Sequence, residues 1–210
     1  SHGIRTSFLE YPGEARVNTK IFDQTAHEVT EINESGPSVD HDMLHAFETQ
    51  LLSLVREEDV VVLTGSLPPG CPKNYYAHLM SCLPCPCVLD ADGEALAQGV
   101  TAGPLFIKPN IAELGQLLNR NLSTHSDILS ACAQLVTQGV GFVAVSMGGA
   151  GALISNGKEA YFAPALKLNG DSTVGAGDSM VAGMLHAWLG GDSLAQILQS
   201  GAAASAASIT

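Results

Sequence analysis

The sequence predicts an α/β protein: a mostly parallel sheet with helices on both faces of it, plus a small β-sheet lid. Strand-like and helix-like segments alternate from residue 59 to residue 146, which is the pattern of crossover units. Short strand-like segments without helices between them precede this region. Polar residues or glycines follow each strand of the alternating region.

Residues 1–37 are expected to form part of the lid, with short strands over 7–10, 15–23 and 28–33. Segment 15–23 alternates apolar and polar residues, as a strand with two different faces does. We place a domain boundary between residues 37 and 38, so that residues 38–210 form the α/β core.

The core elements follow from hydrophobic periodicity. Helices are expected over 39–56, 74–82, 93–99, 110–118, 126–138, 175–189 and from 193 onward. Strands are expected over 59–64, 87–90, 105–108, 142–146, 152–155 and 160–163. The last two strands flank Asn156 and Gly157, a dipeptide that favours a β-hairpin turn.

Four of the expected parallel strands end in polar or conformationally permissive residues. These ends are Thr64-Gly65-Ser66, Asp90, Lys108-Pro109-Asn110 and Ser146-Met147-Gly148-Gly149. In open α/β sheets the ligand binds at the carboxyl ends of the strands. The sequence therefore predicts one site along this edge.

Composition limits the partners of the protein. The formal net charge is −12 with only nine Lys and Arg residues, which argues against nucleic acids and anionic membrane surfaces. No apolar run approaches membrane-spanning length and no signal-peptide pattern is visible in these residues, so we expect neither a membrane span nor a signal peptide. Five cysteines indicate reduced thiols and a cytoplasmic location. The C-x-x-C-x-C run at Cys82 lacks further ligands, so we expect no metal there.

Gly175-Ala176-Gly177-Asp178 stands immediately before a long apolar-periodic run. Such a turn opens a helix, and free N–H groups together with the helix dipole make the helix start an anion site. Small side chains let a bulky anion approach the backbone. Asp178 is either a carboxylate that acts on the bound anion or an acid favoured in a first helical turn.

Two common nucleotide motifs are excluded. Residues 65 and 70 have the glycine spacing of a P-loop, but Cys71 and Pro72 replace its Lys and Ser/Thr. Gly175-x-Gly177 begins a dinucleotide fingerprint, but Met180 occupies the position of the third glycine.

Six motifs together resemble the ribokinase/PfkB-type carbohydrate kinases, in particular their sugar-phosphate branch, over nearly the whole chain. They are Arg16-x-Asn18, the segment 30–37, the segment 65–70, Lys108-Pro109-Asn110-x-x-Glu113, Ser146-x-Gly148-x-x-Gly151 and the segment 173–178. The resemblance implies a ribokinase-like fold, a nucleotide-binding core, and ATP and Mg²⁺ as cofactors.

The resemblance also implies a role for each matching residue. Asp178 would take the proton of the acceptor hydroxyl, and the N–H groups of Gly175, Ala176 and Gly177 would hold the developing charge. ATP would contact Lys108, Ser146, Gly148, Gly151 and Gly177. The sugar phosphate would contact Arg16, Asn18, Gly65, Ser66 and Asp178. Asn110 and Glu113 would hold Mg²⁺, although the same pair is also a helix capping box.

The expected reaction is phosphorylation of fructose 1-phosphate to fructose 1,6-bisphosphate. Tagatose 6-phosphate, fructose 6-phosphate or a nucleoside are alternative acceptors, and a non-catalytic nucleotide- or sugar-phosphate-binding protein is the alternative of another class. Family members continue beyond both ends of this sequence, so we expect truncation at both ends and an incomplete nucleotide pocket after Thr210. A homodimer through the β lid is also expected.

Overall fold

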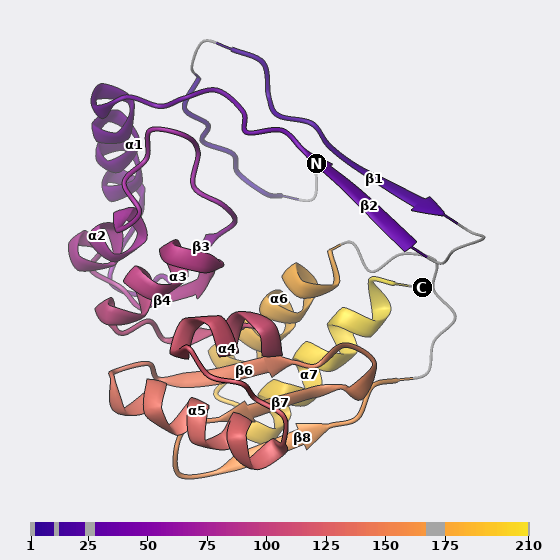
Figure 1. The fold of residues 1–210 in the computed structure, drawn as a ribbon. Coiled ribbons are helices and arrows are strands. Elements are labelled where there is room, and N and C mark those ends of the chain that lie inside the picture. The colour runs from indigo at the N-terminus through magenta and orange to yellow at the C-terminus, as the bar shows by residue number, and fades with distance from the viewer. Residues whose placement is uncertain (1–2, 11–12, 24–27, 167–174, 210) are drawn as a thin grey trace. The chain divides into compact units, whose positions relative to one another are not determined.

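A computed structural model describes residues 3–10, 13–23, 28–166 and 175–209 (Figure 1). The chain divides into two compact units, which are described one at a time. The first comprises Ser1–Val55 and Leu67–Lys73, and the second comprises Arg56–Ser66 and Asn74–Thr210. The domain boundary predicted between residues 37 and 38 stays a prediction.

The first unit contains a β-hairpin and one helix. Strands β1 (Asn18–Asp23) and β2 (Glu28–Asn33) pair antiparallel, and α1 spans His41–Leu54. The strand predicted over residues 7–10 is wrong, because these residues adopt no regular structure. Within the described residues β1 and β2 form a sheet of two strands only, so a further strand there has no ladder to join.

The second unit is built on a six-stranded sheet. In spatial order the strands are β3 (Val61–Thr64), β4 (Cys87–Asp90), β5 (Phe106–Ile107), β6 (Phe142–Ser146), β7 (Ala152–Ser155) and β8 (Ala160–Ala163). Neighbouring strands from β3 to β6 are parallel to one another. β7 pairs antiparallel with both β6 and β8. The mostly parallel sheet and the hairpin that closes it are both confirmed.

Helices cover both faces of this sheet, as predicted. They are α2 (Tyr75–Cys82), α3 (Gly93–Gly99), α4 (Ile111–Leu118), α5 (His125–Thr137), α6 (Ala176–Leu189) and α7 (Leu194–Ala207). Short 3₁₀ turns follow at Val100–Ala102 and Gly148–Ala150. Because β3 to β6 follow one another in space and in sequence, right-handed crossovers place α2 to α5 on one face. Figure 1 shows α4 and α5 on one side of the sheet and α6 and α7 on the other.

Alternating strand residues supply the core under α6 and α7. Phe106 and Phe142 stack there with ring centroids 4.7 Å apart, and Met184 from α6 is fully buried. The next residues along the same strands, Ile107 and Val143, are also fully buried. Because successive side chains of a strand point to opposite faces, these two belong to the face that α2 to α5 cover. A sheet buried on both faces fixes the strand register tightly.

The crossing of α6 and α7 depends on two glycines. A Cβ atom on Gly183 would lie 2.6 Å from the Ser200 carbonyl oxygen and 2.7 Å from the Ala204 Cβ. A Cβ on Gly201 would collide with Met184. The two helix backbones therefore approach more closely than any larger residue at these positions allows.

We expect Gly183→Ala to lower the free energy of unfolding by about 1–3 kcal/mol, because overpacking outweighs the gain in helix propensity. Urea unfolding of the two proteins measures the difference. Gly149→Ala is the control, since a Cβ there meets no heavy atom within 4 Å. Equal stability of Gly183→Ala and the parent protein would show that the crossing can widen freely.

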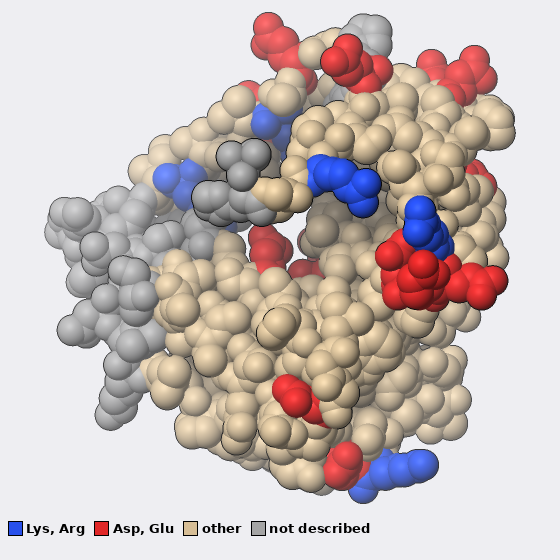
Figure 2. Space-filling model, turned by 180° about the vertical axis from the view of Figure 1, so that it is seen from behind, with Lys and Arg blue, Asp and Glu red and all other residues tan. Residues whose placement is uncertain are grey.

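The surface carries few cationic side chains. On the face that Figure 2 shows, the Lys and Arg side chains of the described residues stand apart from one another, and some of them adjoin Asp or Glu side chains. In the part of the chain that the structure describes, every helix is too short or too polar to cross a bilayer.

Candidate active site

The carboxyl ends of β3 to β6 bring the predicted strand-end residues together in the second unit. Thr64 pairs with Asp90, and Leu89 pairs with Ile107, so Asp90 and Lys108 leave adjacent strands at the same level. Asn110 forms a parallel bridge with Ser146, the last residue of β6. The sheet register therefore accounts for the common edge that the sequence predicted.

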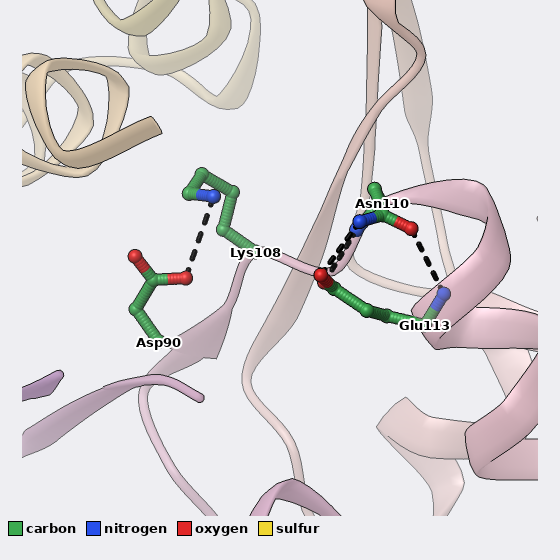
Figure 3. Close-up of polar contacts among 4 residues, drawn as sticks. All are labelled: Asp90, Lys108, Asn110 and Glu113. Carbon is green, nitrogen blue, oxygen red and sulfur yellow. Dashed lines mark hydrogen bonds and ion pairs between the residues drawn. The ribbon is translucent and has the colours of Figure 1, made fainter. Parts of the chain in front are cut away.

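Lys108 lies between β4 and the start of α6. Its Nζ is 3.4 Å from Oδ1 of Asp90, and the two side chains are only 10% and 17% exposed (Figure 3). The position that a Cβ of Gly177 would occupy is 3.2 Å from the same Nζ. Gly177 thus leaves the space in which the ammonium group sits, and the cation stands beside the first turn of the helix.

Asp178 is an exposed residue of the first turn of α6. Gly175 begins the helix with φ of +79°, a left-handed conformation that favours glycine, and its carbonyl accepts from Ser179 N at 2.9 Å. Helix geometry leaves the N–H groups of residues 176–178 without intrahelical acceptors. Amide donors without intrahelical acceptors, a carboxylate and a nearby lysine ammonium are thus gathered at one helix end.

The pKa of Asp90 is raised above its ordinary value. Burial is the main cause and outweighs the attraction of Lys108, and the negative charge of Asp178 raises the pKa further. The Asp178 carboxylate is therefore near enough to Asp90 to act on its ionisation. The charged form of Asp90 consequently opposes folding.

The raised pKa of Asp90 makes the folding stability depend on pH in a direction that can be predicted. Between the ordinary carboxyl pKa, about 4, and the higher folded value, the native state binds more protons than the unfolded state, so stability falls as pH rises through that window. We expect Asp90→Asn to gain stability relative to the parent protein across the window, and the difference to stay constant above it. Urea unfolding at a series of pH values measures this, and parallel curves would contradict it.

Asn110 and Glu113 form a complete capping box at the start of α4. The Asn110 side-chain oxygen accepts from Glu113 N at 2.9 Å, and the Glu113 carboxylate accepts from Asn110 N at 2.9 Å and from its Nδ2 at 2.6 Å (Figure 3). Each carboxylate oxygen keeps a further lone pair. The oxygen atoms of Asn110 and Glu113 therefore fit an Mg²⁺ ion that is held through its water ligands, since Mg²⁺ binds oxygen and retains several waters.

The motif Ser146-x-Gly148-x-x-Gly151 covers the end of β6 and the turn that follows it. Ser146 N donates to the Pro109 carbonyl at 3.0 Å, which ties this turn to the Lys108–Asn110 segment. Gly148 is exposed with φ of +55°, and a Cβ there would meet open space. A Cβ on Gly151 would instead collide with the Ala163 carbonyl, so Gly151 is also required for packing against the end of β8.

Gly65 and Ser66 follow β3 at the same edge. Gly65 has φ of +92°, and its N–H donates to the Asp90 carbonyl at 3.1 Å. The buried Tyr76 hydroxyl donates to the carbonyls of Thr64 and Gly65, at 3.0 Å each. Tyr76 thus fixes the backbone at the point where the chain leaves the strand.

Two parts of the predicted site are not described together with this group. Arg16 and Asn18 belong to the first unit, so their contact with a sugar phosphate stays a prediction. Thr173 and Val174, which open the Gly-Ala-Gly-Asp motif, lie outside the described residues.

Sequence reasoning assigned no role to Asp90 and noted it only as a strand end. Its link to Lys108 depends on the register of β4 and β5, which a single sequence does not show. A usable signal was present, because Asp90 and Lys108 are the first polar residues at the carboxyl ends of adjacent buried strands. Burial raises the pKa of Cys87 to about 11, and its thiol donates to the Cys85 carbonyl.

The chain matches the family model of the pfkB family carbohydrate kinases over residues 1–210. It is 41% identical over 194 residues to 1-phosphofructokinase of Rhodobacter capsulatus. This match covers 88% of this chain and 60% of the relative. It is 35% identical over 211 residues to 1-phosphofructokinase of Escherichia coli K12, and this match covers 99% of this chain and 67% of that relative. The chain thus spans about 60% of the length of the first relative.

Among solved structures, phosphofructokinase-2 from Escherichia coli in complex with potassium matches with a TM-score of 0.87 and 30% identity. The match covers 96% of this chain and 66% of that one. The ribokinase-like architecture and the match of the family model over residues 1–210 agree with each other. The chain belongs to the pfkB family of carbohydrate kinases.

Proposed function

We propose that the protein transfers the γ-phosphoryl group of ATP to a sugar phosphate, with fructose 1-phosphate as the first acceptor and fructose 1,6-bisphosphate as the product. The observation that carries this proposal is the position of Asp178 in the first turn of α6, the turn whose Gly177 lies beside the Lys108 ammonium. The names of the curated relatives, all 1-phosphofructokinases in the matches given above, support the choice of acceptor.

The residues of the edge have separate tasks in this proposal. Asp178 accepts the proton of the sugar hydroxyl, and its exposed carboxylate is accessible for that. The N–H groups at the start of α6 and the Lys108 ammonium stabilise negative charge on the transferred group. ATP, when bound, supplies the phosphoryl group.

The site fits both proposed cofactors. Gly177 keeps the side of the Lys108 ammonium that faces α6 free of a Cβ, which would lie 3.2 Å from Nζ. The exposed Gly148 would let a nucleotide approach the turn after β6. Asn110 and Glu113 would hold Mg²⁺ through its waters, at the end of a strand adjacent to β6.

Turnover assays on the full-length protein test the proposal. ATP consumption is measured with fructose 1-phosphate, fructose 6-phosphate, tagatose 6-phosphate and unphosphorylated fructose at equal concentrations. We expect the highest kcat/KM with fructose 1-phosphate. Preference for another ketose phosphate would change the acceptor, and ATP consumption with none of them would refute the kinase proposal.

Glu113→Gln separates capping from metal binding. Glutamine serves at this position of a capping box, so we expect helix stability to change by less than about 1 kcal/mol. Removal of the charge should raise the Mg²⁺ concentration for half-maximal rate by about 10- to 100-fold. Thermal unfolding and a Mg²⁺ titration of the rate measure the two effects. An unaltered Mg²⁺ requirement would leave Glu113 with the capping role alone.

We also propose that the β1–β2 sheet forms a homodimer contact. Ile21 and Ile32 lie on the same face of this sheet and are 52% and 54% exposed. Large exposed apolar residues on one face favour association. Light scattering on the full-length protein and on Ile32→Lys tests this, and an unchanged molar mass would exclude this face as the contact.

A further inference from the structure

Asp90 and Lys108 form an ion pair where two neighbouring strands end. The pair joins the last residue of β4 to the residue directly after β5, at 3.4 Å. The parallel register of Leu89 with Ile107 sets the two side chains at one level. The contact is therefore a product of the sheet itself and needs no loop to hold it.

Stability does not explain the Asp90 carboxylate. Burial and the nearby Asp178 both disfavour its charge, and they outweigh the favourable effect of Lys108. A neutral residue of the same shape would relieve this penalty. A charged group that opposes folding in this way is typical of a functional position.

The Lys108 ammonium lies at a position that the dipole of α6 disfavours for a cation. It lies beside Gly177 in the first turn of α6, where the helix dipole repels a cation. A lysine side chain is also flexible, so it loses considerable rotamer entropy when it is held in one position. An anionic partner on the opposite side offsets both effects, and Asp90 is that partner.

We infer that Asp90 is a positioning residue, which holds the Lys108 ammonium at the start of α6 so that it meets the transferred phosphate. This inference rests on the proposed function, because it gives Lys108 a phosphate to meet. It predicts a split between kcat and KM. Asp90→Asn removes a negative charge that repels the nucleotide phosphates, so the KM for ATP should stay equal or fall. Turnover should fall because the ammonium is no longer held.

A double-mutant cycle in the full-length protein tests the inference. The four proteins are the parent, Asp90→Asn, Lys108→Met and the double variant. We expect Asp90→Asn to lower kcat about tenfold or more in the parent background, as misplacement of a catalytic group does. In the Lys108→Met background the same change should have an effect of less than about twofold, because residues that act through one contact are not additive.

Other outcomes of the cycle would overturn the inference. An equal loss in both backgrounds would mean that Asp90 acts independently of Lys108, and a normal kcat in Asp90→Asn would mean that it has no role in turnover. Asp90→Glu, which keeps the charge, should recover part of the rate. Asp92→Asn is the matched control, since Asp92 is an exposed acid two residues later whose side chain makes no capping hydrogen bond.

Thermal unfolding separates positioning from a structural role. We expect Asp90→Asn to unfold at the same or a higher temperature than the parent protein while it turns over more slowly. A lower unfolding temperature together with a loss of rate that persists in the Lys108→Met background would identify a structural role instead.

Lysine acylation tests the positioning without any kinase activity. The full-length protein is treated briefly with acetic anhydride, and mass spectrometry compares Lys108 with the exposed Lys158 in the same molecule. In Asp90→Asn, loss of the ion pair should raise the Lys108 to Lys158 labelling ratio about fivefold. An unchanged ratio would overturn the inference even if the protein is a kinase. A raised ratio in a protein without activity would refute the proposed function and leave the positioning intact.

Discussion

Asp178→Asn is expected to lower kcat by about 10²- to 10⁴-fold, the range that general-base catalysis typically contributes. Asparagine has nearly the same shape as aspartate but cannot take the proton of the sugar hydroxyl. The carboxylate is exposed at the start of α6, so its removal leaves the buried core untouched. Steady-state turnover with ATP and fructose 1-phosphate measures the loss.

The fold should survive this change. An acid in the first turn of a helix contributes about 0.3–1 kcal/mol through the helix dipole, so the unfolding temperature should fall only slightly. Asp192→Asn is the control, since Asp192 is an exposed acid shortly after the other end of the same helix. Turnover of Asp178→Asn within tenfold of the parent value would remove Asp178 from the mechanism.

Lys108→Met is expected to lower kcat/KM for ATP by about 10²-fold or more, as removal of a donor to developing charge does. Methionine keeps most of the side-chain volume but loses the ammonium that lies 3.4 Å from Asp90. The loss also leaves the Asp90 carboxylate partly buried without this partner, so stability should fall by about 1–3 kcal/mol. The rates must therefore be measured well below the unfolding temperature.

Two further variants make this result specific. Lys108→Arg should recover little activity, because a planar guanidinium is wider than an ammonium and the Lys108 side chain is only 10% exposed. Lys158→Met, at an exposed lysine of the β7–β8 hairpin turn, should behave as the parent protein. Full activity of Lys108→Met would show that the nucleotide phosphates do not use this residue.

The sequence was sufficient for the order of elements in the second unit. Long buried strands such as β6 and helices with clear caps such as α4 have strong local signals, and their observed bounds lie close to the expected ones. Periodicity also placed the β7–β8 hairpin, because Asn156 and Gly157 specify the turn. These features depend on residues that are near one another in the chain.

What the sequence could not provide depends on contacts between distant residues. The segment 7–10 looks like a strand, but a strand requires a partner edge, and local sequence does not report one. β5 has only two residues, fewer than the predicted segment 105–108, because pairing with β4 and β6 ends early. The Asp90–Lys108 pair likewise depends on strand register.

The motifs themselves were ambiguous until the structure placed them. Asn110 and Glu113 form the capping box that their spacing allowed, so the structure supports the structural role directly and leaves the metal role as a proposal. Gly151 has a packing reason in the end of β8, which no motif indicates. Gly177, by contrast, lies beside the Lys108 ammonium, where a Cβ would come within 3.2 Å of Nζ, and its lack of a side chain suits the phosphate-binding role that we propose.

A crystal structure of the full-length protein with fructose 1-phosphate and a non-hydrolysable ATP analogue with Mg²⁺ tests the central claim most directly. The proposal predicts that the terminal phosphate lies at the start of α6 beside Lys108, with the acceptor hydroxyl within hydrogen-bond distance of the Asp178 carboxylate. A terminal phosphate bound away from the start of α6, with no sugar hydroxyl near Asp178, would contradict it.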